Sequence, residues 1–503
     1  MNTRIRRLGL VMVLLYVALF VKLNQTQLLD AKSLNDRADN NRKVTQDFNH
    51  ARGVIATADG TIVAESDPTS DTRFRYQRTY PTGDLFSSVV GTYSYQFGSD
   101  GVERTYSDQL SGRTTELRYP SLKDLFSEDP NVGDVHLTLR ADLQQAAKEA
   151  LGDRKGSVVA VDPRTGAVLA LWSYPSYDSN LVATNDATKA KAIRELLDAS
   201  PDKPRLAKAY RERFFPGSTF KIITAAAGLD SGKVSDTAPV YPVQRSFTPP
   251  LTTRALKNFG GESCGGALPD LLRVSCNSGF AAMGSLTLGP QPMIQQAEGF
   301  GFNSVPPIDL PQAVSSTYPT DFGKRVKAGA QPGDADIFEN SAKLAQTSIG
   351  QNDVSATPLQ MALVVASVVN GGRIMTPHVM DKISDSRGRV VQTYETSVWK
   401  TAMTAEAAAT LRNDLIGVAQ NGTATGLQIP GLEIGGKTGT AQLGTPTPKS
   451  HAWIVAFGGQ PGQPSEIAVS VIVEGQDGAS EQTGGRVAAP IARAVMAKAL
   501  GRS

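Results

Sequence analysis

Histidine, cysteine and net charge are all scarce in this 503-residue chain, and each scarcity excludes a class of function. The net charge is only +3, with no basic cluster beyond the N-terminus, so nothing indicates a nucleic-acid-binding protein. Two cysteines without a nearby histidine do not complete a metal site, and we expect neither a metal nor a cofactor. The four histidines stand in no motif of a catalytic triad, and only His451 is kept as a candidate neighbour of a catalytic group.

Long hydrophobic runs are rare as well, and the one that stands out lies at the N-terminus, from Leu8 to Val21. Its length fits either the hydrophobic region of a signal peptide or a short membrane span. No small-x-small cleavage site follows closely, so we predict an uncleaved anchor over residues 8–24. The run is preceded by Arg4, Arg6 and Arg7. By the positive-inside rule, residues 1–7 then form a cytoplasmic tail and the rest of the chain lies outside the cell membrane.

Three short motifs carry the candidate chemistry. They are S-x-x-K at Ser218 and Lys221, S-x-N at Ser275 and Asn277, and K-T-G-T from Lys437 to Thr440. S-x-x-K also occurs at Ser200 and Ser397, and S-x-N at Ser33, whereas K-T-G occurs only once. The set, in this order, supplies a serine nucleophile, cationic proton-transfer partners and a strand that can receive a peptide. It predicts an enzyme that works through an acyl-serine intermediate.

The context of Ser218 separates it from the other two serines. Pro216 and Gly217 precede it, and an unbroken apolar run follows up to Gly228, which predicts a buried helix that begins at the serine. A helix N-terminus favours developing negative charge. Lys221 would lie one turn later on the same face. A lysine can replace histidine as the base if burial and a second cation lower its pKa, and Lys437 would be that cation.

The segment around Lys437 also matches the phosphate-loop pattern, because Gly431 and Gly436 stand at the required spacing before Lys437 and Thr438. A phosphate loop must follow a buried strand and open a helix. Here Pro430 precedes the segment, and Gly439 and Thr440 stand where helix residues should follow. We therefore predict an edge strand, whose glycines let a substrate backbone approach and whose Thr438 and Thr440 hydroxyls can hold a carboxylate.

Cys264 and Cys276 lie close together in sequence, in what should be an oxidising compartment. A disulfide is one interpretation. The other is a pair of free thiols, with Cys276 packed as a small apolar residue and Cys264 at the surface. The residues leave both open.

The remainder divides into a polar stretch, a strand-rich region and a longer catalytic part. Residues 25–50 are rich in Asn and Asp and predict a stalk. Alternating runs such as GVIATADGTIVAES and LFSSVVGTYSYQF then predict a strand-rich module. After a helical segment that ends at Gly152, SVVAV and AVLALWS predict a hairpin, IVAF and EIAVSVIV predict strands, and RVAAPIARAVMAKAL predicts a closing helix. We divide the chain into a stalk and non-catalytic module over 25–152 and a catalytic domain over 153–503.

The chain resembles the class B penicillin-binding proteins, in particular the penicillin-binding protein A group of actinobacteria. Besides the three motifs, the matching segments are Arg52-Gly53-x-Ile55, RTYPTG (78–83), Val90-Gly91-Thr92-Tyr93, Gly101-Val102-Glu103, DPRTGAVLALWSYPSYDSN, SIGQNDVSATPLQMA (348–362), NGTA (421–424) and HAWIVAF (451–457). Thr57-Ala58 stand where many relatives have Asp-Arg, and Asn352-Asp353 where a glycine is common. Both departures lie outside the catalytic motifs.

The resemblance implies an α+β fold, in which a transpeptidase domain with an antiparallel sheet flanked by helices follows the strand-rich module and a single transmembrane anchor. It implies D,D-transpeptidation of peptidoglycan stem peptides during cell-wall synthesis, inhibited covalently by β-lactams. It also implies a membrane glycan polymerase of the shape or division machinery as partner. The implied roles are Ser218 as nucleophile, Lys221 as base, Ser275 as proton relay held by Asn277 and Lys437, Thr438, Gly439 and Thr440 as substrate-binding residues, and the backbone N–H groups of Ser218 and Thr440 as the oxyanion hole.

Three alternatives stay open. A β-lactamase shares the motifs but would need a deacylating water, and rarely carries an anchor and a module. A D,D-carboxypeptidase differs only in using water as the acceptor. A non-catalytic binding or sensor protein would have to keep all three motifs without using them.

Overall fold

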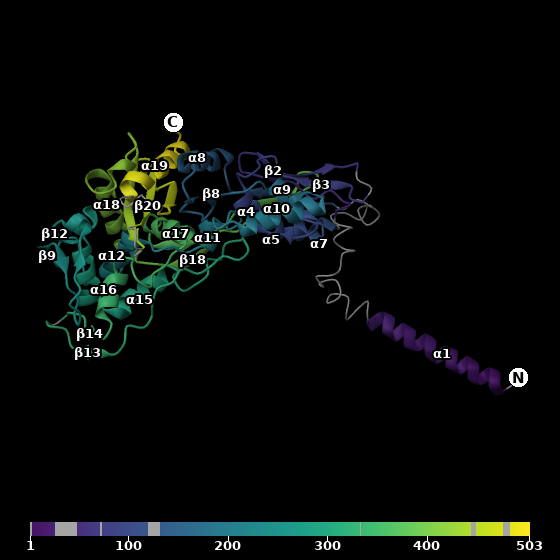
Figure 1. Cartoon of the computed structure of the whole chain (residues 1–503), viewed down its shortest axis with the longest axis horizontal. Helices are drawn as coiled ribbons and strands as arrows, with labels where there is room; N and C mark the ends of the chain where they lie inside the picture. Colours follow the sequence, from purple (N-terminus) through teal and green to yellow (C-terminus); the bar gives the residue numbers. More distant parts are fainter. Residues whose placement is uncertain are drawn as a thin grey trace.

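The computed structural model describes residues 3–25, 48–70, 73–118, 131–331, 333–443, 449–475 and 483–502 (Figure 1). Most of the predicted stalk, residues 26–47, lies outside these ranges. Helix α1 (Thr3–Asn24) contains the predicted anchor and has no buried residue. Within the described ranges it is the one helix long and apolar enough to cross a membrane, with a mean hydropathy of 1.8 over its most apolar window. It therefore has the length and composition of a single span.

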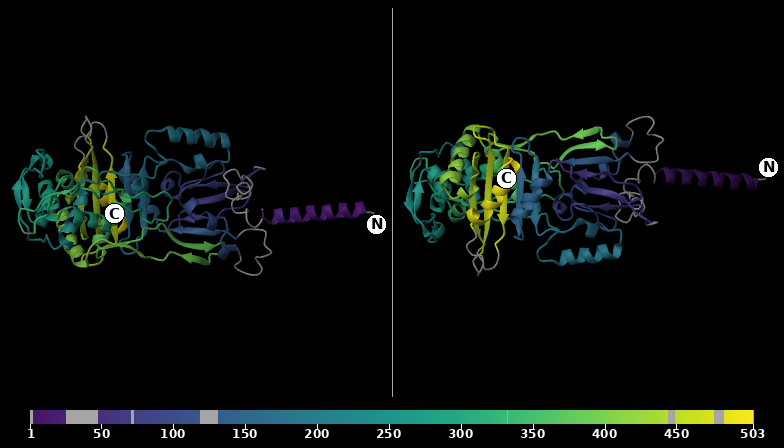
Figure 2. Two further views of the ribbon diagram at one scale, coloured as in Figure 1. Left: turned by 90° about the horizontal axis from the view of Figure 1, so that it is seen from below. Right: turned by 90° about the horizontal axis from the view of Figure 1, so that it is seen from above.

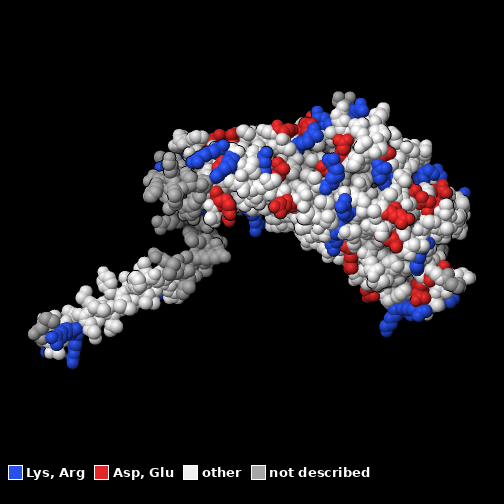
Figure 3. Space-filling view, turned by 180° about the vertical axis from the view of Figure 1, so that it is seen from behind, with Lys and Arg blue, Asp and Glu red and all other residues white. Residues whose placement is uncertain are grey.

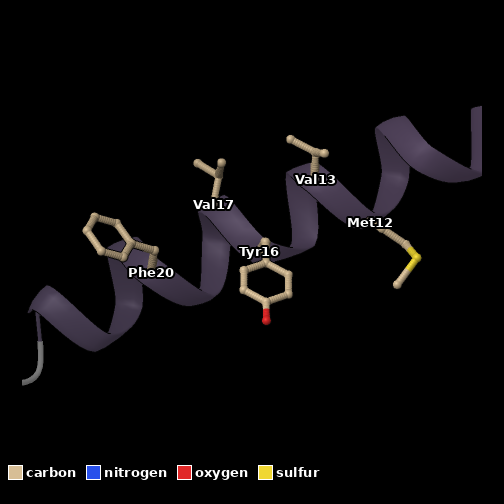
Figure 4. Close-up of a pocket in the computed structure, with 5 residues that line it drawn as sticks. All are labelled: Met12, Val13, Tyr16, Val17 and Phe20. Carbon is tan, nitrogen blue, oxygen red and sulfur yellow. The ribbon is translucent and has the colours of Figure 1, made fainter.

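A shallow hollow runs along α1 between its own side chains (Figure 4). It is lined by Met12, Val13, Tyr16, Val17 and Phe20. Apart from the Tyr16 hydroxyl, this lining offers no polar group that could orient a small ligand. The hollow suits acyl chains or another membrane helix, so a substrate site must be sought in the rest of the chain.

The catalytic part is built on a five-stranded antiparallel sheet. Its spatial order is β19 (Glu433–Gln442), β20 (Ser450–Gly459), β21 (Ile467–Val473), β7 (Gly156–Val161) and β8 (Val168–Tyr174). The hairpin and the two later strands predicted from the sequence are all present, and β19 is an edge strand as predicted. Every residue of β7 and β21 is buried, so both faces of the sheet are covered.

Helices cover the two faces of this sheet. α8 (Ala141–Leu151) and α19 (Ala489–Ala499) pack together on one face, and α17 (Pro358–Val368), of which every residue is buried, packs on the other (Figure 1). Gly152 ends α8 as predicted. A helical lobe adjoins the β19 edge and is formed by α12 (Lys221–Asp230), α13 (Leu268–Arg273), α14 (Asn277–Ala282), α15 (Pro290–Gly299), α16 (Ser341–Thr347) and α18 (Ala405–Asn421).

Short elements fill the connections. The two-stranded pieces are β9 (Tyr241–Gln244) with β12 (Cys264–Gly266), β10 (Ser246–Phe247) with β11 (Leu256–Lys257), β13 (Arg325–Lys327) with β14 (Ile337–Phe338), and β15 (Arg373–Met375) with β18 (Val398–Thr401). The connections also contain the short helices α9 (Ser179–Ala183) and α11 (Lys208–Arg211) and the longer helix α10 (Ala187–Ala199).

The N-terminal module contains a six-stranded sheet that the linear division of the chain does not anticipate. Its order is β17 (Val390–Thr393), β16 (Met380–Asp385), β6 (Gly133–Leu137), β1 (Ile55–Ala56), β2 (Ile62–Pro68) and β3 (Tyr76–Thr79). β16 and β17 come from the middle of the catalytic part and lie beside the module strands (Figure 2). The chain thus returns to complete the module, and a cut at residue 152 would remove two of its strands.

The strand-rich module predicted from the sequence is present, and it also contains short helices. The first alternating run forms β1 and β2, but the second forms helix α4 (Ser87–Val90) and a minimal hairpin of β4 (Tyr93–Ser94) and β5 (Gly98–Ser99). Three further short helices follow, α5 (Gly101–Thr105), α6 (Ser107–Leu110) and α7 (Thr115–Arg118). In α4 the adjacent residues Val89 and Val90 are both buried, which alternation along a half-exposed strand would not allow.

Four of the resembling segments meet in one buried ionic cluster in the module. Glu103 is completely buried and accepts hydrogen bonds from Arg52 Nε and Arg78 Nε, each at 2.6 Å. The Tyr80 hydroxyl donates to the same carboxylate at 3.3 Å, and the Arg52 guanidinium lies 4.3 Å from the centre of the Tyr93 ring. Burial alone would raise the pKa of Glu103, but the charges of Arg78 and Arg52 outweigh it and hold the pKa below its usual value.

We expect Glu103→Gln to destabilise the module by about 3 kcal/mol, because two buried guanidinium groups would lose their counter-charge. Since the folded-state pKa of Glu103 is depressed, this stabilisation is present above the pKa of the unfolded carboxyl and is lost as the pH falls through the folded value. Urea unfolding of the detergent-solubilised chain measures the effect. Asp108→Asn, which breaks the exposed pair with Arg113, is the control and should cost less than about 1 kcal/mol. An equal cost for both variants would contradict the cluster's importance.

Acidic and basic side chains are interspersed over the face of the molecule shown in Figure 3, apart from the basic group at the outer end of α1. No continuous basic stripe of the kind that tracks a nucleic-acid backbone runs across this face.

Candidate active site

Ser218 lies in a 3₁₀ turn, η3 (Gly217–Phe220), that runs directly into α12 at Lys221. The buried helix predicted to begin at the serine is therefore present, with its first turn in 3₁₀ geometry and α-helical geometry from Lys221 onward. Gly217 has a φ of +54°, and a Cβ there would lie 2.8 Å from the carbonyl oxygen of Thr440. Only glycine fits this close approach. It lets the chain pass directly beside β19, and the helix begins there with the tighter 3₁₀ turn. Ser218 is half-buried, and its hydroxyl has no hydrogen-bond partner among the described residues.

The resembling segment at 348–362 supports the same turn from the other side. The Gly217 N–H donates to the Gly350 carbonyl at 3.0 Å, and a Cβ on Gly350 would lie 2.1 Å from the Gly217 carbonyl oxygen. Two residues further on, Asn352 has a φ of +64°. Asparagine tolerates this region better than most side chains, which explains physically how it can stand where relatives have a glycine.

Lys221 and Lys437 are both completely buried, and both contact Ser275. Lys221 Nζ donates to the Ser275 carbonyl at 2.6 Å and to Asn277 Oδ1 at 2.7 Å, and lies 3.2 Å from Ser275 Oγ. Lys437 Nζ donates to Ser275 Oγ at 2.8 Å and to the Thr438 carbonyl at 3.1 Å. The structure thus brings the three sequence motifs into one hydrogen-bonded group.

The electrostatics of this group favour a neutral Lys221. Burial lowers its pKa well below 10.5, and the charge of Lys437 lowers it further. Burial lowers the pKa of Lys437 to about 7. A neutral amine has two N–H groups, and the oxygens of Ser275 and Asn277 can take both. The lone pair of Lys221 is then left to accept a proton from a serine hydroxyl.

Ser275 occupies a backbone position that usually belongs to glycine. Its φ is +58°, directly after helix α13. The Cys276 N–H donates to the Leu271 carbonyl at 2.9 Å and the Ser275 N–H to the Leu272 carbonyl at 3.1 Å, which is the hydrogen-bond pattern of a Schellman motif. The catalytic part therefore holds this serine in a left-handed conformation at a cost in stability, as is common at functional sites.

We expect Ser275→Gly to be more stable than Ser275→Ala by about 1 kcal/mol, the reverse of the usual order of these two residues. Both variants lose the hydroxyl, so the difference isolates the backbone strain. Both should also be acylated far more slowly by penicillin than the unmodified chain. Thermal unfolding and the acylation rate, measured on the same preparations, test the two statements. A Ser275→Ala variant at least as stable as Ser275→Gly would show that the turn is not strained.

Cys264 and Cys276, left open between two interpretations above, form a disulfide bond in the structure. It links strand β12, which pairs with β9, to the turn that carries Ser275 and Asn277. Cys276 is buried and forms the N-cap of α14, which starts at Asn277. The bond therefore restrains the S-x-N turn from its outer side.

We expect the Cys264→Ala variant to be acylated roughly tenfold more slowly, because small displacements of reacting groups have large effects on rate. The bridge closes a 12-residue separation, for which the chain-entropy contribution is about 3 kcal/mol. We expect the loss of the bridge to affect the acylation rate more strongly than it affects the melting temperature of the whole domain. Thiol counting on the denatured, unreduced chain should find no titratable thiol, and two thiols would refute the bridge.

The K-T-G-T segment lies within β19, an extended strand with an open edge, which rules out a phosphate loop opening a helix. Gly439 allows the strand to pass close to the nucleophile turn, since a Cβ there would lie 2.9 Å from the Pro216 carbonyl oxygen. Thr438 is buried and donates to the Thr423 hydroxyl at 2.8 Å, whereas Thr440 is half-buried. Thr423 belongs to none of the three motifs, and its place in the NGTA segment (421–424) is the only signal of it in the sequence.

The other sequence candidates lie outside this group. Ser200 is the C-cap of α10, and Ser397 hydrogen-bonds Thr376 just before β18. His451 accepts a hydrogen bond from the Gly475 N–H at 3.1 Å, and burial lowers its pKa to about 4. It therefore stays neutral, and no hydrogen bond joins it to the serines or lysines in the described residues. Those residues also contain no group of three or more His, Cys, Asp or Glu that could hold a metal.

A serine at the start of a buried helix, two buried lysines and a second serine, gathered at the edge of an antiparallel sheet, define a serine acyltransferase. Two family profiles match the chain: "Penicillin binding protein transpeptidase domain" over residues 156–497 and "Penicillin binding protein A dimerisation domain" over residues 52–135. The chain therefore belongs to the penicillin-binding protein transpeptidase family, as a class B member.

Its relatives are similar along the whole chain. It is 38% identical to peptidoglycan D,D-transpeptidase PbpA of Mycolicibacterium smegmatis and 36% identical to PbpA of Mycobacterium tuberculosis, with 99% of both chains covered in each case. Among solved structures it resembles penicillin-binding protein A of M. tuberculosis in a ceftriaxone acyl-enzyme complex. That match has a TM-score of 0.81 and 34% identity, and covers 91% of this chain and all of that one.

Proposed function

We propose that the chain is a peptidoglycan D,D-transpeptidase that cross-links stem peptides through an acyl-serine intermediate and is inhibited by β-lactams. The observation that carries this proposal is the buried Lys221 amine, which is placed one turn after Ser218 and hydrogen-bonded to the S-x-N turn. The names of the PbpA relatives and the acyl-enzyme complexes of penicillin-binding protein A support it.

The proposed first half-reaction is acylation. A stem peptide adds along the open edge of β19, with its terminal carboxylate beside Thr438, Gly439 and Thr440. Ser218 Oγ attacks the carbonyl carbon of the D-Ala-D-Ala bond as its proton passes to neutral Lys221. The backbone N–H groups of Ser218 and Thr440 hold the oxyanion, which is typically worth about 3 kcal/mol for each donor.

The intermediate then collapses and the peptide C–N bond breaks. Ser275, hydrogen-bonded to Lys221 and Lys437 and anchored beside Asn277, passes a proton to the nitrogen of the leaving D-alanine. In the second half-reaction an amine of a neighbouring strand attacks the ester carbonyl, loses its proton to the same relay, and releases Ser218 as the new peptide bond forms. No step requires a cofactor.

The single apolar helix at the N-terminus supports membrane anchoring, and we propose that residues 1–7 are cytoplasmic while the catalytic domain faces outward. We further propose a membrane glycan polymerase of the shape or division machinery as partner. For the domains we propose the division at residue 152, with the profile matches at 52–135 and 156–497 in support and with β16 and β17 as the catalytic domain's contribution to the module.

Mass spectrometry after incubation with benzylpenicillin tests the acyl-serine chemistry. We expect a single penicilloyl adduct on the peptide that contains Ser218, with a lifetime of many turnover times. A rapidly hydrolysed adduct would indicate a β-lactamase, and no adduct would indicate a non-catalytic binding protein. A synthetic stem peptide with a labelled acceptor amine then separates the remaining options, because a carboxypeptidase releases D-alanine without incorporating the label.

A further inference from the structure

Thr423 lies beside the site, but the proposed mechanism gives it no role. It follows the end of α18 and lies at the surface, whereas its neighbour Thr438 on β19 is buried. The Thr438 hydroxyl donates its hydrogen bond to Thr423 Oγ1 at 2.8 Å. A hydroxyl has a single proton. The proton of Thr438 is therefore already used, and Thr438 alone cannot donate to a substrate carboxylate.

The proton of Thr423 is the one that remains available. No acceptor for it exists among the described residues. The backbone of Gly485 closes one side of the pair, since a Cβ there would lie 2.8 Å from the Thr423 carbonyl oxygen and 3.7 Å from Thr438 Cγ2. Because Thr423 is exposed, its hydroxyl can turn toward the solvent-filled side, where the substrate carboxylate is expected.

The position of Thr423 is tied to both flanking motifs. Its N–H donates to the Arg273 carbonyl at 3.1 Å, at the end of α13 and two residues before Ser275. A Cβ on Gly422 would lie 2.5 Å from the same carbonyl oxygen, so the chain passes α13 at a distance that requires glycine. Thr423 is thus held between the S-x-N turn and the K-T-G-T strand.

We propose that Thr423 is a specificity-determining residue of the transpeptidase site, where its hydroxyl donates to the terminal carboxylate of the donor peptide or of a β-lactam. Thr438 acts through it by supplying the hydrogen bond that orients the Thr423 oxygen, and Thr440 contributes a second hydroxyl. The hydroxyls of Thr423 and Thr440 would recognise the carboxylate through short-range hydrogen bonds. Unlike a charged lysine or arginine side chain, they would add little long-range attraction. This inference rests on the proposed function and extends it to the recognition of the free carboxyl group.

The test compares benzylpenicillin with its methyl ester, which lacks the carboxylate, in acylation of the detergent-solubilised full chain. The unmodified chain should react faster with the acid than with the ester. Thr423→Val should slow the reaction with the acid about tenfold, the typical effect of losing one charge-assisted hydrogen bond, and change the reaction with the ester less than twofold. The preference for the acid would then fall about tenfold. Thr423→Ser should restore it.

Thr425→Val is the matched control, since Thr425 is an exposed threonine two residues away whose side chain makes no hydrogen bond in the described structure. It should leave both rates unchanged. If Thr423→Val slows the reactions with the acid and the ester equally, or changes neither rate, Thr423 does not recognise the carboxylate. The inference then fails while the proposed function stands. If the unmodified chain forms no adduct with the acid, the proposed function fails and the inference with it.

Discussion

Replacing Ser218 with alanine abolishes covalent labelling of the full chain by a fluorescent penicillin. The expected loss is complete, because the acyl bond forms on Ser218 Oγ and, among the residues the structure describes, no other hydroxyl combines a position at the start of a buried helix with a buried lysine one turn away. The fold of the η3 turn does not depend on the Ser218 hydroxyl, because this hydroxyl has no hydrogen-bond partner in the described structure. Thermal unfolding of the variant should therefore match that of the unmodified chain.

Two serines of the same S-x-x-K pattern provide the controls. Ser200→Ala, at the end of α10, and Ser397→Ala, before β18, should leave labelling intact, because neither serine is hydrogen-bonded to Lys221 or Lys437 in the described structure. Fluorescence of the labelled band in a denaturing gel gives the comparison. Undiminished labelling of the Ser218 variant would overturn the mechanism at its first step.

Replacing Lys221 with arginine should lower the acylation rate by about a thousandfold while the fold persists. A guanidinium stays protonated at every working pH, so it can hold the Ser275 and Asn277 oxygens but cannot accept the proton of Ser218. The rate is measured with benzylpenicillin in single-turnover experiments. A rate close to that of the unmodified chain would assign the base elsewhere, with Ser275 the next group in the network.

The pH profile of the unmodified chain provides a second measurement of the same base. Burial and the charge of Lys437 lower the pKa of Lys221 well below 10.5, which favours the neutral amine that can accept the proton of Ser218. As the pH falls through this lowered pKa the amine gains a proton, and acylation should decline steeply. The arginine variant should lack this acid limb, since it has no base to titrate. An identical acid limb in both proteins would exclude Lys221 as its source.

Much of the fold could be predicted because its signals are local. The alternation and turn chemistry around DPRTG predicted the β7–β8 hairpin, and Gly152 marked the end of α8. The failures came where distant packing competes with local pattern. Val89 and Val90 of the second alternating run became part of α4, because both could be buried in the module core. Strands β16 and β17 were missed because their partner β6 lies far away in sequence.

By itself, the sequence determined which residues supply the chemistry, because a nucleophile, its lysine one turn later and the K-T-G-T strand are short strings whose order can be read directly. Only the tertiary structure decided what those residues can do. It buried Lys221 and Lys437 together against Ser275, which lowers their pKa values, and it held Ser275 in a left-handed turn restrained by a disulfide. It also placed Thr423 against Thr438. Burial, bridging and contacts between distant segments are properties of the packed interior, and no local pattern in a chain specifies them.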